Sequence, residues 1–182
     1  MMHNKSKKTI TEYEKKLKNY YWKCFISEIC KVLFFLIIFI RLNLTTEYCS
    51  ALFFLMILRI NGGGLHFKHY ISCLIVSFSF LAASIALALY VVPQQLFMII
   101  SLLSSLPVII RLIPITSSNR PPATPDQVFK CKRNTFIIMI IFILLLCLHP
   151  VSTYLCIGYW TTILHVLQLI IAHIHKEVSK NV

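Results

Sequence analysis

Acidic side chains are scarce in this sequence: aspartate and glutamate account for six of its 182 residues, and all charged residues for 13%. A soluble domain carries about a quarter charged residues. Hydrophobic residues make up 58% of the chain, and they occur in long blocks, as membrane spans require. The composition therefore excludes an ordinary soluble domain and predicts one membrane-embedded domain over residues 1–182.

Paired cysteines are also missing. None of the seven cysteines belongs to a C-x-x-C motif, and an odd number of thiols does not indicate a disulfide framework. The first apolar stretch starts near Cys24 and no small-x-small site follows it, so we expect a retained anchor rather than a cleaved signal peptide. No cofactor and no bound metal are expected.

The net charge of +12 is unevenly distributed. Eight of the 18 basic residues lie within the first 31 residues, and five more lie between Arg111 and Arg133. Both clusters border apolar blocks, which the positive-inside rule and attraction to anionic lipid explain. We therefore expect an anionic lipid membrane as a partner and no nucleic acid.

The N-terminal residues 1–23 are predicted to form an amphipathic helix in the membrane interface. From Ile10 to Cys24, apolar residues recur at spacings of three and four, while lysines occupy the other faces. Thr11 and Glu14 have the spacing of a capping box. A solvated charged tail is the alternative interpretation.

Membrane spans are counted most directly from the charges. Two runs of 42 residues, between Lys68 and Arg111 and between Arg133 and Lys176, carry no charged side chain. Each run is about 63 Å of helix, which is enough for two crossings of the hydrocarbon layer. Polar breaks at residues 93–95 and 149–150 divide the runs into two hairpins. Because all four flanks are basic, both hairpins should return to the cytoplasmic side.

The first apolar region is less hydrophobic, because residues 24–58 include four charged side chains. Two short crossings that turn between Arg41 and Glu47 would place its flanks on the same side. The prediction is an all-α polytopic fold of about six transmembrane helices, four within residues 24–110 and two within 135–175, with both termini cytoplasmic. A first pair that penetrates only partly is the alternative.

The connection over residues 111–134 differs from its surroundings. It contains four of the seven prolines and the basic residues Lys130, Lys132 and Arg133. Proline fixes φ and removes a hydrogen-bond donor. We therefore predict a stiff, extended, basic cytoplasmic loop.

Three of the four glycines are consecutive, at residues 62–64, close to a predicted span boundary. Adjacent glycines weaken a helix and allow positive φ. Unwound backbone at membrane depth is tolerated only beside protein or a polar cavity. A cavity at the inner face is the implication.

A histidine and a cysteine follow this break, which suggests thiolate chemistry, because a basic partner or a helix N-terminus lowers the pKa of a thiol. On one straight helix, His66 and Cys73 would be about 10.5 Å apart, whereas His69 is an i, i+4 neighbour of Cys73. The residues alone favour His69 slightly. A packed core cysteine and a zinc site of these three residues are the alternatives.

The same segment resembles the accessory gene regulator B (AgrB) family of bacterial membrane cysteine endopeptidases. The resemblance rests on the spacing of Arg59, Gly64, His66 and Cys73 and on a second motif over residues 113–121, which contains Pro114, Arg120 and Pro121. Two departures are present: isoleucine at 113 replaces a small residue, and the glycines at 62 and 63 are not part of the family pattern.

The resemblance implies that His66 and Cys73 are the catalytic pair, at the cytoplasmic side of a bacterial cell membrane. It also implies a partner, a small amphipathic propeptide with an acidic C-terminal tail, which is cleaved and cyclised into a thiolactone or lactone signal for quorum sensing. The basic residues Arg111, Arg120, Lys130, Lys132 and Arg133 would complement that tail, unless they only set topology. A homodimer is compatible with this interpretation.

Several roles stay open at this point. Arg59 could be catalytic or could snorkel at a span end, and the third residue that orients the histidine could be Asp126, Asn61 or Ser72. Four other histidines are expected to be interfacial or packed side chains, at positions 149, 165, 173 and 175. The alternative function is a non-enzymatic membrane component, such as a transporter subunit or a sensor anchor.

Overall fold

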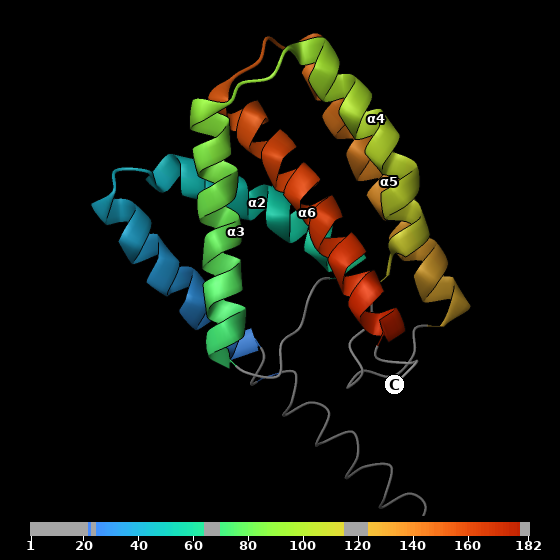
Figure 1. Cartoon of the computed structure of the whole chain (residues 1–182), viewed down its shortest axis with the longest axis horizontal. Coiled ribbons are helices and arrows are strands. Elements are labelled where there is room, and N and C mark those ends of the chain that lie inside the picture. The colour runs from blue at the N-terminus through green and yellow to red at the C-terminus, as the bar shows by residue number, and fades with distance from the viewer. Residues whose placement is uncertain (1–21, 23–24, 64–69, 115–123, 179–182) are drawn as a thin grey trace, which may run out of the picture. The chain divides into compact units, whose positions relative to one another are not determined.

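The computed structural model describes residues 22, 25–63, 70–114 and 124–178. Its secondary-structure elements are helices, which confirms the predicted all-α class. A first helix covers residues 25–41. Five further helices follow (Figure 1): α2 (Thr45–Gly62), α3 (Tyr70–Tyr90), α4 (Gln95–Leu112), α5 (Pro125–Leu148) and α6 (Thr153–Val178).

The chain divides into two compact units, Met1–Thr45 and Thr46–Val182. In the first unit, the helix over 25–41 ends in a Schellman motif. Asn43 has a φ of 57°, the N–H of Leu44 donates to Phe39 O at 2.9 Å, and that of Asn43 donates to Ile40 O at 3.1 Å. These bonds satisfy carbonyls that a helix end leaves free. The turn falls within the predicted interval of residues 41–47.

In the second unit, four helices are long and apolar enough to cross a membrane: Tyr70–Tyr90, Gln95–Leu112, Pro125–Leu148 and Thr153–Ile174. They correspond to the two charge-free runs, and the breaks between them fall at residues 91–94 and 149–152, as predicted. Neither the helix over 25–41 nor α2 is among these four. The count of six crossings, the interfacial helix and the placement of the termini therefore stay predictions.

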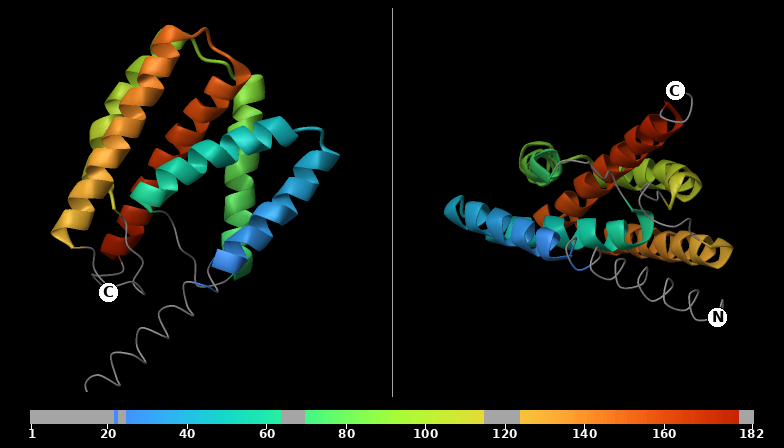
Figure 2. Two further views of the ribbon diagram at one scale, coloured as in Figure 1. Left: turned by 180° about the vertical axis from the view of Figure 1, so that it is seen from behind. Right: turned by 90° about the horizontal axis from the view of Figure 1, so that it is seen from below.

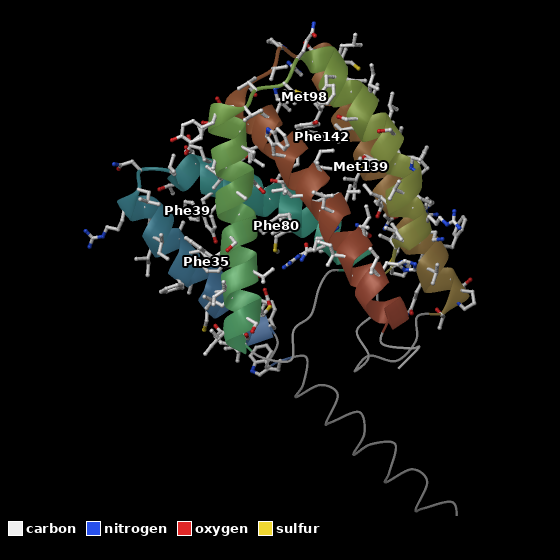
Figure 3. All side chains as sticks on the ribbon, in the orientation of Figure 1. Phe35, Phe39, Phe80, Met98, Met139 and Phe142 are labelled. Atoms are coloured by element: carbon white, nitrogen blue, oxygen red, sulfur yellow. The ribbon has the colours of Figure 1, made fainter. Side chains whose placement is uncertain are left out.

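α6 is the central helix of this unit. It packs against α3 and α4, and α4 packs against α5. Within its candidate span 61% of the residues are buried, against at most 28% in the other three. Met98, Met139 and Phe142 lie between α4, α5 and α6 (Figure 3). The apolar core therefore forms around α6, and the other spans leave large apolar faces for lipid.

α2 crosses the face of α6 instead of running beside the other spans (Figure 2). The Phe54 ring lies on Gly158 so closely that a Cβ at position 158 would be 2.6 Å from Phe54 Cζ. The same ring packs on Phe142 of α5, with 5.0 Å between the ring centroids. Glycine at 158 is thus required by this close approach, which brings α2 against the bundle.

The prediction of a loop over residues 111–134 is wrong for its second half, because α5 begins at Pro125. Thr124 caps the helix, and its side chain and that of Gln127 form a capping box. Proline is well suited to the first helical position, where its missing N–H is not needed. Lys130, Lys132 and Arg133 therefore lie on a helix.

The two hairpin connections lie at the same end of the bundle (Figure 1), and side-chain hydrogen bonds join each of them to a neighbouring helix. Trp160 Nε1 donates to Val91 O at 2.9 Å, and Cys156 Sγ lies 3.8 Å from the same oxygen. Gln95 Nε2 donates to the carbonyls of Leu146 and His149. These donors satisfy carbonyls that the ends of α3 and α5 leave free. We call this the connecting end of the bundle.

Candidate active site

The opposite end of the bundle contains the start of α3, the ends of α4 and α6, and the start of α5 (Figure 1). The end of α2 lies against the same part of α6, as the contacts below show. Arg59 is in the last turn of α2. The N–H of Gly63 donates to Arg59 O at 3.0 Å, and Gly63 has a φ of 76°. This left-handed residue ends α2, so the second glycine of the run is required by backbone conformation.

The first glycine of the run is in close contact with two other elements. A Cβ at Gly62 would lie 3.2 Å from Nε2 of His165 on α6 and 3.4 Å from Cγ2 of Ile113, the residue after α4. Ile113 is the first residue of the second motif, and Gly62 precedes Gly64 of the first. The fold thus brings together two motif-bearing segments that are about 50 residues apart in the sequence.

An amide pair joins α2 to α5 at the same place. Asn134 Nδ2 donates to Asn61 Oδ1 at 3.4 Å, and Asn61 Nδ2 donates to Ile57 O at 3.3 Å. Asn61 was one of three candidates for the residue that orients the histidine. Its described hydrogen bonds form a contact between α2 and α5, with Asn134 adjacent to the basic residue Arg133 in the chain.

Cys73 is the fourth residue of α3 and is half-buried, and this helix starts at Tyr70, within the charge-free run that follows Lys68. The first turn of a helix carries partial positive charge, which favours an anionic side chain. Gly64, His66 and the alternative base His69 lie outside the described residues. Because six residues separate Gly63 from Tyr70, the Cα atoms of these two residues can lie at most about 25 Å apart.

The second motif is described only at its start. Pro114 follows α4 directly and is half-buried, and the Ile113–Pro114 peptide bond is cis. Arg120 and Pro121 lie outside the described residues. Ile113 is 3% exposed, so the bulky residue that departs from the family pattern is accommodated in the core beside Gly62.

The basic residues on α5 face outward in part. Lys130 and Arg133 are exposed and Lys132 is half-buried. Within the part of the chain that the structure describes, none of the three is in an ion pair. Asp126, in the first turn of α5, is exposed. The positive charge of this helix start is therefore available to an external anionic group.

Sequence analysis did not single out the polar face of α6. Thr161, His165 and Gln168 recur at spacings of four and three, and all three are at most 5% exposed. The expectation of a packed side chain is confirmed for His165, whereas His149 and His173 are exposed. The spacing of these three polar residues within a mostly apolar span was the signal that could have found this face.

Among the described residues, no group of three histidine, cysteine or acidic side chains is close enough to hold a metal ion. The zinc alternative needs His66 and His69, which lie outside those residues.

The fold and the site define a class: a multi-pass helical membrane protein with a cysteine at a helix start and with two motif-bearing segments that meet at Gly62 and Ile113. The chain matches the accessory gene regulator B family over residues 1–169. It therefore belongs to that family. No curated protein and no solved structure shows significant similarity to it.

Proposed function

We propose that this chain is a membrane-embedded cysteine endopeptidase that removes the C-terminal tail of a small AgrD-like propeptide and helps to cyclise the remainder into an autoinducing peptide. Membership of the accessory gene regulator B family supports a role in that quorum-sensing system with a propeptide partner. In this proposal the site faces the cytoplasm at the bacterial cell membrane, and His66 and Cys73 are the catalytic pair.

One observation carries the proposal: Gly62 and Ile113, from the two motif-bearing segments, meet beside α6. α6 also packs against α3, which carries Cys73. The elements that bear the family motifs are therefore held on one common helix. Residues that must act together need such a scaffold, because reacting groups misplaced by about 1 Å can lose a factor of about 100 in rate.

The proposed reaction is acyl transfer. His66 accepts the thiol proton, and the Cys73 sulfur attacks the carbonyl carbon at the junction between the signal sequence and the tail. The C–N bond breaks, the amine of the tail leaves with the proton from His66, and a thioester acyl-enzyme forms. A cysteine or serine within the signal then attacks this thioester and closes the ring, and its proton passes through His66 to the leaving Cys73 sulfur, which restores the free thiol.

Exchange of one thioester for another is nearly isoenergetic, so hydrolysis must be prevented by exclusion of water. A site at the membrane boundary meets this need. The developing oxyanion also needs a hydrogen-bond donor. The N–H of Gly63 already donates to Arg59 O, so the donor that we assign in the glycine run is Gly64. Unchanged turnover in Gly64→Ala would remove that role.

The experiment that tests the function is co-expression with the propeptide encoded by the neighbouring gene, with cleavage followed by mass spectrometry. Cys73→Ala and His66→Ala should abolish cleavage, because one removes the nucleophile and the other its base. His69→Ala is the matched control and should process the propeptide normally. Processing by Cys73→Ala would show that the chain is not this enzyme.

A further inference from the structure

α6 carries an imidazole that the proposed reaction does not use. His165 lies inside the candidate span Thr153–Ile174 and is 1% exposed. Polar groups within a bilayer are costly, and they are usually retained for a specific role. Apolar packing alone does not account for a histidine at this position, because an apolar side chain would not carry that cost.

The contact between His165 and α2 explains a glycine that the family pattern does not. Gly62 does not have a positive φ, so its backbone conformation does not require glycine. Alanine would be the better helix former by about 1 kcal/mol. Among the described residues, the atoms nearest to a Cβ at this position belong to the His165 imidazole, at 3.2 Å, and to Ile113, at 3.4 Å. Glycine at 62 therefore lets the imidazole approach the backbone of α2.

The surroundings of the imidazole are partly charged. Arg59, one turn before Gly63 on α2, interacts electrostatically with His165. Gln168 lies near the ring on α6, yet neither Nδ1 of His165 nor Oε1 of Gln168 has a hydrogen-bond partner of normal geometry among the described residues. The imidazole therefore meets α2 by its close approach to Gly62, and Ile113 lies beside the same glycine.

The two contacts of α2 with α6 have the same direction along both helices. Phe54 of α2 contacts Gly158 of α6, and Gly62 of α2 contacts His165 of α6. Gly62 comes eight residues after Phe54, and His165 comes seven residues after Gly158. These steps correspond to about 12 Å and about 10.5 Å of helix. The aromatic contact places the middle of α2 on α6, and the imidazole contact places its end.

We propose that His165 is a positioning residue for the reaction under "Proposed function", on which this inference rests. It holds the C-terminal end of α2 on α6, and so fixes where the connection that carries His66 begins. The same helix holds α3, which carries Cys73. His165 thereby sets the separation between the end of α2 and the nucleophile Cys73 without touching the substrate.

The first test measures geometry and needs no activity. Spin labels are attached to Cys73 and to a cysteine at exposed position 60, in full-length chain with its other cysteines replaced by alanine, in lipid vesicles. Double electron–electron resonance should give a narrow distance distribution. His165→Leu should broaden it at least twofold, whereas His173→Leu, at an exposed position on the same helix, should not. An unchanged distribution in His165→Leu would overturn the inference.

The second test measures kinetics with the propeptide. His165→Leu should lower kcat about tenfold or more and change KM less than about twofold, because misplacement acts on the chemical step. His165→Gln, whose amide can occupy the same space, should recover most of the rate. His173→Leu should match the native chain. A change in KM without a change in kcat would contradict a positioning role. So would a loss of activity in His165→Gln that is as complete as the loss in His66→Ala.

A double-mutant cycle tests the contact itself. Gly62→Ala should lower kcat about threefold when His165 is present, because the ring must then move by a few tenths of an ångström. In the His165→Ala background the same substitution should have no further effect. Additive effects would overturn the inference, and this cycle also decides the matter if His165→Leu does not accumulate in the membrane.

The two proposals can fail separately. If the native chain does not process the propeptide but the label distances respond to His165, the enzyme assignment fails and the structural role of His165 stands. If the native chain processes the propeptide while distances and kcat ignore position 165, only the positioning role fails.

Discussion

The two ends of the helical bundle are held together by different chemistry. At the connecting end, side-chain donors bind free backbone carbonyls: Trp160 binds Val91, and Gln95 binds Leu146 and His149. At the opposite end, helices meet through a glycine–imidazole contact and an amide pair. The first arrangement closes two short turns. The second brings the motif-bearing segments together and leaves basic side chains exposed, so we expect stability to depend on one end and activity on the other.

The largest contrast should come from two cysteines, one at each end. Cys73→Ser should lower propeptide cleavage by at least about 1000-fold, because a neutral hydroxyl is a far weaker nucleophile than a thiolate. Cys156→Ser, at a buried position beside Val91 O, should change cleavage less than about twofold. Cleavage is measured in membranes that contain equal amounts of each variant. Equal losses in the two variants would remove the functional difference between the ends.

A smaller effect is expected from the charges on α5. Reversal of Lys130, Lys132 and Arg133 to glutamate should raise KM about tenfold at low salt, because the proposed acidic tail would be repelled. The difference from the native chain should shrink as salt rises, since exposed charges are screened. Arg41→Glu, at an exposed position in the other unit, is the control. A KM that is unchanged by the triple reversal would leave these residues with a topological role only.

At the connecting end, the expected effect is on stability. Gln95→Ala removes the donor to Leu146 and His149 and should cost about 1–2 kcal/mol, the usual range for lost hydrogen bonds of partly buried groups. Gln94→Ala is the matched control, because Gln94 is adjacent and exposed and makes no side-chain cap. Thermal unfolding in detergent micelles measures both. Cleavage by the folded Gln95→Ala chain should be unchanged, and a selective loss of cleavage would contradict the division between the ends.

The smallest effect concerns the start of α5. Thr124→Ala removes half of the capping box and should cost about 1 kcal/mol. Gln127→Ala removes the other half and should cost less, because the Thr124 side chain still accepts from the backbone. The start of α5 carries the basic residues, so the loss of the cap should also raise KM, but only slightly. No change in the unfolding temperature of Thr124→Ala would show that Pro125 alone determines where α5 begins.

The membrane hairpins could be predicted from the sequence, because an apolar run bounded by charges leaves few other structures in lipid. The breaks at residues 93–95 and 149–150 are confirmed for that reason. The start of α5 was missed because four prolines suggested a loop, although Thr124 and Gln127 have the spacing of a capping box. The number of prolines was given more weight than the capping pattern of Thr124 and Gln127, and a loop was therefore predicted where a helix begins.

The charge-free run that follows Lys68 indicated that Cys73 is near a helix start, and the structure agrees. It could not place His165 near Gly62, because that contact depends on how α2 crosses α6, and the crossing depends on the glycine at 158 and the Phe54 ring. Contacts between segments about 100 residues apart are set by packing, which spacing within one segment does not encode.

Because the indole of Trp160 donates a hydrogen bond to Val91, its fluorescence can report on the hairpin turn. The sequence has two tryptophans, so Trp22→Phe leaves a single indole, and its N–H is bound to a carbonyl in a hairpin turn. Indole emission shifts with the polarity and hydrogen bonding of the ring. The fluorescence of that variant would report in real time whether the turn opens when a peptide arrives at the far side of the bundle.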